Sequence, residues 1–216
     1  MTQALVGFDK LGKSFAGKDA DGTLINTDKV GTIVRFATFQ ATATQRGNKT
    51  RPGAGLEITA ILLRNVSGGA LLGKRLGLLS SVAGYTPAWE VINYTTVHAN
   101  KLAVLIDPWL SSDGVADDDL FWGIIGGPAV ILTPIAGADF KGDIAVNAQL
   151  VAATGTTTGA TTSGRISQIS IANATDAQGA IDQALAVLGR ALSARTTGET
   201  AADLLVYWNN RNFAHA

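Results

Sequence analysis

The chain has 216 residues, of which 46% are hydrophobic and only 16% are charged, and its 17 basic and 17 acidic side chains cancel. This balance argues against nucleic acid and anionic membranes as partners, because both select a net positive face. The absence of cysteine excludes disulfides and thiolate metal sites. The start MTQALVGFDK lacks a signal-peptide pattern and no apolar run approaches the ~18 residues of a membrane span, so we expect a soluble protein made in the cytosol. The low charge density indicates that part of the surface is covered, for example by copies of the same chain.

Residues 1–29 predict an extended N-terminal arm. Isolated apolar side chains are scattered there among glycine, aspartate and lysine, without the stripe of a helix. Such a segment needs a neighbouring surface on which to bury its aromatic side chains. The residues concerned are the apolar Leu5, Val6, Phe8, Leu11 and Phe15 and the basic Lys10, Lys13, Lys18 and Lys29.

From Val30 the composition becomes that of β-strands, rich in β-branched and aromatic residues. The first two predicted strands, 30–41 and 56–66, flank a loop that holds Arg46, Lys49 and Arg51. This loop is either simply solvated or a contact with an acidic partner. Further strands are predicted at 70–81, 91–98, 101–107, 119–125, 129–135, 142–153, 165–171, 189–194 and 203–208.

Two local features complete the predicted fold. Gly126, Gly127 and Pro128 form a turn signal, so residues 119–135 predict a β-hairpin. The only good helix signal covers about 176–188, where Thr175 or Asp176 can cap it and Gly189 ends it. About ten strands and one short helix predict an all-β barrel or sandwich, with a single β-rich domain over 30–216 behind the arm.

The octet GFDKLGKS, residues 7–14, fits the nucleotide-binding pattern G-x-x-x-x-G-K-[ST]. A working P-loop needs a buried strand before the glycines and a helix after the serine, so that backbone N–H groups and the helix dipole face the phosphate. Only three apolar residues precede the octet, and the following FAGKDADGT has no helical stripe. A nucleotide hydrolase using Gly7, Gly12, Lys13 and Ser14 is therefore the weakest of the functions considered.

Other candidate sites are also weak. Asp107, Asp113, Asp117, Asp118 and Asp119 form the densest carboxylate group, but the EF-hand spacing is absent and a solvated acidic loop is favoured over a Ca²⁺ or Mg²⁺ site. His98 and His215 are the only histidines, and no G-x-S-x-G elbow surrounds a serine. The aromatic residues are either a sugar- or base-stacking surface or, more commonly on strands, core and subunit interface. They are Trp89, Trp109, Trp122, Trp208, Tyr85, Tyr94 and Tyr207.

Two segments carry a family resemblance. DPWLSSDGVADDDLFWGIIGGPAVILTP (107–134) and GRALSARTTGETAADLLVYW (189–208) resemble virion proteins encoded among the structural genes of tailed bacteriophages and prophages. The passage GDIAVNAQLVAATGTTTGATTSGR between them is similar to the same proteins. The resemblance covers roughly residues 102–208 and implies a non-enzymatic head decoration or cement protein, without cofactor, metal or catalytic residues.

The resemblance also implies partners and a location. The partners are the phage major capsid protein and further copies of the chain, usually as a trimer on the capsid surface, assembled in the host cytoplasm. Nucleic acid and membrane are not expected partners. For such a role we expect Phe8, Leu11 and Phe15 to bury on an adjacent subunit, while Lys10, Lys13, Lys18 and the loop residues Arg46, Lys49 and Arg51 meet acidic groups. The alternative is a head or tail fibre component that binds host glycans through exposed aromatic residues.

Overall fold

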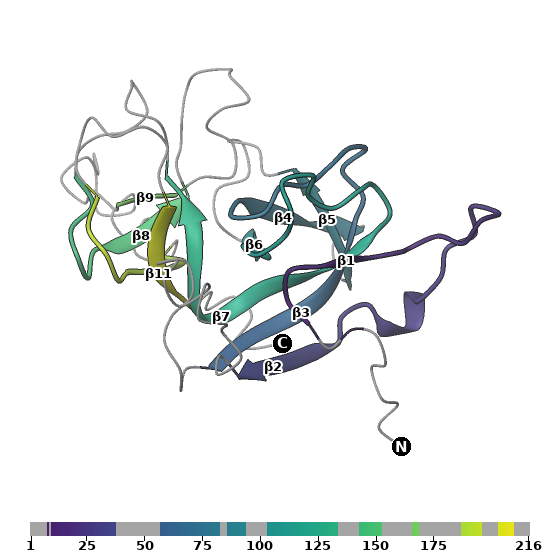
Figure 1. The fold of residues 1–216 in the computed structure, drawn as a ribbon, viewed down its shortest axis with the longest axis horizontal. Coiled ribbons are helices and arrows are strands. Elements are labelled where there is room, and N and C mark those ends of the chain that lie inside the picture. The colour runs from purple at the N-terminus through teal and green to yellow at the C-terminus, as the bar shows by residue number, and fades with distance from the viewer. Residues whose placement is uncertain are drawn as a thin grey trace.

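A computed structural model describes residues 8, 10–37, 57–82, 86–93, 103–133, 143–152, 166–168, 187–195 and 203–209. These residues form eleven strands in one connected sheet and a single short 3₁₀ turn, η1 (Thr27–Lys29), which confirms the all-β prediction (Figure 1). The loop 42–55 and the predicted helix up to residue 186 lie outside the described ranges. Within those ranges no helix has the length and hydropathy needed to span a bilayer.

The strands vary from two to thirteen residues. Their bounds are β1 (Ser14–Phe15), β2 (Ile33–Ala37), β3 (Glu57–Asn65), β4 (Leu76–Val82), β5 (Thr86–Asn93), β6 (Ala103–Ile106), β7 (Leu120–Leu132), β8 (Gln149–Ala152), β9 (Ile166–Gln168), β10 (Gly189–Ala191) and β11 (Asp203–Asn209).

Five of these strands close on themselves into a ring. β3 pairs in parallel with β5, and antiparallel pairs then lead from β5 to β4, β6, β7 and back to β3. All five strands contribute to one buried cluster that includes Ile61, Val91, Val104 and Phe121. A barrel of so few strands has room inside only for side chains, so this cluster fills the ring.

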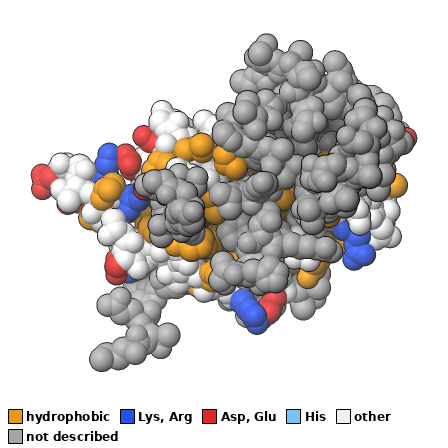
Figure 2. All heavy atoms as spheres, turned by 180° about the vertical axis from the view of Figure 1, so that it is seen from behind, with side chains coloured by type: hydrophobic (Ala, Val, Ile, Leu, Met, Phe, Trp, Pro, Cys, Tyr) orange, Lys and Arg blue, Asp and Glu red, His pale blue; other side chains and the backbone are white. Residues whose placement is uncertain are grey.

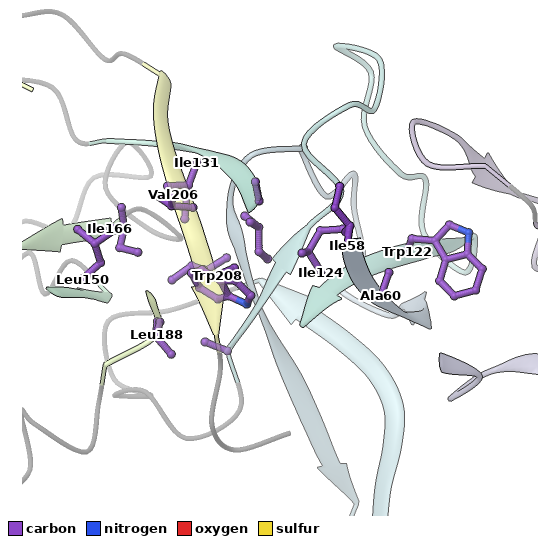
Figure 3. Packing of buried hydrophobic residues seen from close by; sticks show 14 of the residues in the cluster. Ile58, Ala60, Trp122, Ile124, Ile131, Leu150, Ile166, Leu188, Val206 and Trp208 are labelled. Atoms are coloured by element: carbon purple, nitrogen blue, oxygen red, sulfur yellow. The ribbon is translucent and has the colours of Figure 1, made fainter. Parts of the chain in front are cut away.

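The outer face of the ring is buried as well. Ala60 and Leu62 alternate with Ile61 and Leu63 along β3 and belong to a second cluster. Figure 3 shows this second cluster extending from Ile58 and Ala60 to Val206 and Trp208 on β11. A strand with both faces buried reads as a continuous apolar run, which explains the sequence EITAILL of β3.

β7 joins the ring to the rest of the sheet. Its first half pairs with β3 and β6, and its second half pairs with β11, which continues to β10, β8 and β9. The register with β3 shifts at Thr59, leaving Ile125 as an extra residue, and Gly127 has a φ of +97°. The hairpin predicted over 119–135 is therefore wrong: the Gly-Gly-Pro sequence bends one continuous strand instead of reversing it. Proline is tolerated at such a distorted point of a strand.

Candidate interaction surface

Phe8, Leu11 and Phe15, the described apolar residues of the first half of the predicted arm, lie against the chain's own core. Phe8 is only 6% exposed, its ring lies 4.5 Å from that of Phe15, and Leu11 and Phe15 pack on the cluster outside the ring. Phe8 is therefore covered within its own chain, whereas Leu11 and Phe15 are only half-buried and keep part of their surface for the predicted contact with an adjacent subunit. Phe8, Leu11 and Phe15 lie on the β-domain because the ring's outer face supplies the apolar surface that they need.

Main-chain and side-chain hydrogen bonds hold this N-terminal segment, residues 10–29, in place. β1 adds to the edge of β7 through the pairs Ser14 with Phe121 and Phe15 with Leu120. The N–H of Gly12 donates to the buried carboxylate of Asp107, and the N–H of Gly17 donates to Asp119 Oδ1 at 3.2 Å. Both acceptors come from the acidic stretch of the sequence.

The buried Arg64, at the end of β3, is the central anchor of the segment. Its Nη1 donates to the carbonyl oxygens of Gly17 and Asp118, both at 3.0 Å, and its Nη2 donates to that of Ile25, also at 3.0 Å. A guanidinium suits this position because its fixed fork of donors reaches several carbonyls at once. Sequence reasoning missed this residue, although a charged residue at the end of an apolar strand is a usable signal.

Between Gly17 and Ile25, two of the three residues that Arg64 binds, the chain forms a hairpin, which we call hairpin 18–24. Lys18 and Leu24 form an antiparallel bridge, and the N–H of Asp19 donates to the carbonyl of Thr23 at 3.0 Å. Asp19 Oδ1 accepts the N–H groups of Asp21 at 3.0 Å and Thr23 at 2.8 Å. All seven residues are exposed, and the hairpin projects away from the body of the molecule (Figure 1).

The lysines of the segment divide into two pairs. Lys18 forms an ion pair of 2.5 Å with Asp118, and Lys29 lies 5.5 Å from the centre of the Phe8 ring and donates to Asn26. Lys10 and Lys13 are exposed and form no ion pair with any described residue. Of the three lysines predicted to meet acidic groups of a partner, Lys18 is therefore already paired within the chain.

Most of the acidic stretch binds the chain's own backbone and side chains, which refines the predicted solvated loop. Asp117 accepts the N–H of Gly68, Asp118 pairs with Lys18, and Asp107 and Asp119 bind the N-terminal segment. Among the described residues no three His, Cys, Asp or Glu side chains converge as metal ligands would. These carboxylates therefore connect neighbouring loops through hydrogen bonds and an ion pair.

The described residues of the octet 7–14 and of the stretch after it do not have the surroundings of a P-loop. Ser14 begins strand β1 instead of a helix, and Gly12 lies against the backbone of Trp109. Within the described residues 10–37 the only helical turn is η1. We therefore expect millimolar Mg-ATP to leave the melting temperature unchanged for both the wild type and Lys13→Ala. A stabilisation that Lys13→Ala abolishes would contradict this expectation.

The described aromatic residues lie mostly in the hydrophobic core, as aromatic residues on strands commonly do. Trp122 and Trp208 are fully buried, and Trp89 and Trp109 pack at the margins of the two clusters. Tyr207, at 41% exposure, is the one large exposed aromatic among the described residues. A glycan platform made of several stacked rings is therefore not formed by this part of the chain. His98, His215, Tyr85, Tyr94, Arg46, Lys49 and Arg51 lie outside the described residues.

Comparison with known proteins gives no family to which the chain can be assigned. A scan against protein-family models, a search of curated proteins and a search of solved structures each returned no match.

Proposed function

We propose that this protein is a non-enzymatic structural component of a phage virion that binds the outer surface of the capsid as a decoration or cement protein. In this proposal it acts as a homo-oligomer, with a trimer favoured, and its partner is the major capsid protein. It needs no cofactor.

One observation carries the proposal: the two segments with the phage resemblance form a single structural unit. Residues 107–134 contain β7, and residues 189–208 contain β10 and nearly all of β11. β7 and β11 pair over seven residues, from Asp203 with Leu132 to Asn209 with Gly126, and β11 continues into β10. Segments separated by more than fifty residues are thus adjacent strands, as expected if the resemblance reflects one shared fold.

The construction of the domain suits such a role. The ring and the adjoining strands bury apolar side chains on both faces of β3 and β7, which gives a rigid body for a particle surface. Decoration relies on many modest contacts made at once by linked copies, so that effective concentration multiplies the affinity. Such binding requires well-ordered exposed elements rather than a deep pocket.

The proposal is tested by adding the purified protein to expanded heads assembled from the major capsid protein of the same phage. We expect it to sediment with the heads and to saturate at a fixed ratio to the shell subunits, and to have an oligomeric mass by light scattering. An unrelated β-protein of similar mass is the control and should remain unbound. A monomer that does not sediment with the heads would overturn the proposal.

A further inference from the structure

Hairpin 18–24 has the properties of a preformed contact element. Its turn is closed by the hydrogen bonds of Asp19, and its base is fixed by Arg64, which binds the carbonyls of Gly17 and Ile25 on either side. The N–H of Ile25 also donates to Gly17 at 2.8 Å. An ordered hairpin loses little conformational entropy when it binds, so its contacts contribute almost fully to affinity.

The hairpin presents one apolar and one acidic group to the solvent. Leu24 is 47% exposed, and Asp21 is exposed and takes part in no ion pair with a described residue. Gly22, between them, has open space around the position of a side chain. Figure 2 shows acidic and basic side chains next to each other near the end of the molecule from which the hairpin projects.

A complementary surface lies earlier in the same segment. Lys10 and Lys13 are exposed and likewise unpaired among the described residues, and the half-buried Leu11 lies between them in the sequence. The chain thus carries the basic Lys10 and Lys13 on either side of Leu11. In the hairpin it carries the acidic Asp21 near Leu24. The two sets form no ion pair within the described chain.

We propose that hairpin 18–24 of one copy binds the Lys10–Lys13 stretch of the next copy. Asp21 meets Lys10 or Lys13, and Leu24 packs on Leu11. In the trimer favoured above this contact is head-to-tail, and head-to-tail contacts generate rings when the rotation between copies closes. This inference rests on the proposed homo-oligomer and names the surfaces that form it.

Charge reversal tests the contact. Asp21→Lys places like charges opposite each other, and so does the double change Lys10→Asp with Lys13→Asp. Each variant alone is therefore expected to raise the dissociation constant of self-association about tenfold or more. Combining the three changes restores the opposite charges and should recover most of the wild-type mass. The matched control is Asp28→Lys, which reverses another exposed acid outside the hairpin and should leave the mass unchanged.

The measurement is sedimentation equilibrium at low salt, with circular dichroism to verify folding. Unchanged association of Asp21→Lys, or no recovery in the combined variant, would overturn the inference. Head binding is measured separately by co-sedimentation. If Asp21→Lys weakens head binding but not self-association, the hairpin contacts the shell protein; this overturns the inference and leaves the decoration proposal intact.

Discussion

Replacing Arg64 with leucine is expected to lower the free energy of unfolding by about 3 kcal/mol or more. The change removes hydrogen bonds from a charged group to three backbone carbonyls, and a hydrogen bond to a charged group contributes about 1.5–3 kcal/mol. The leucine is apolar and cannot satisfy the carbonyls, which remain partly or wholly buried. Chemical denaturation monitored by tryptophan fluorescence measures the loss.

The effect should be local as well as global. Hydrogen exchange is expected to accelerate most in residues 17–25, because Arg64 holds both ends of that stretch. The matched control is Arg35→Leu: its side chain is 72% exposed and lies 3.9 Å from Glu57, a geometry worth about 0–1 kcal/mol. Equal destabilisation by the two variants would show that Arg64 does not anchor residues 17–25.

Gly127→Ala is expected to destabilise the fold by about 2–5 kcal/mol. A Cβ at this position would lie 2.2 Å from the carbonyl oxygen of Glu57, so the backbone of β3 or β7 must move. The φ of +97° adds a further cost of about 1–2 kcal/mol for a residue with a side chain. Thermal unfolding by calorimetry measures the change.

Gly22→Ala separates the two causes. Gly22 has a similar φ of +80°, but a Cβ there would meet nothing within 4 Å. It should therefore cost only the conformational part, about 1–2 kcal/mol. If both alanine variants lose the same stability, the close approach of β7 to Glu57 is not what makes Gly127 necessary.

The sequence was sufficient for the β-class and for many strands, because local composition reports it. β3, β4, β6 and β11 lie within or close to apolar, β-branched runs, and their burial follows from those runs. Pairing was not predictable in the same way. The closure of β3 on both β5 and β7 joins residues far apart in the chain, and no local pattern encodes it.

One wrong prediction and one missed ion pair have specific physical reasons. The Gly126-Gly127-Pro128 sequence is typical of a turn, but Gly127 is required by its approach to Glu57 and by its φ, both of which depend on tertiary contacts. The ion pair of Lys18 with Asp118 was missed because sequence spacing could not place Asp118 opposite it. The candidate surface was thus half predictable: exposure of Lys10 and Lys13 was expected, whereas the ordered hairpin was not.

The pairing of β1 with β7 also sets a sequence of events during synthesis. Ser14 pairs with Phe121, so 107 further residues must be translated before its partner exists. At about 5–20 residues per second, the N-terminal segment waits roughly 5–20 s for β7. During that interval Phe8, Leu11 and Phe15 lack the β7 surface that later covers them, so their apolar side chains stay exposed on the nascent chain.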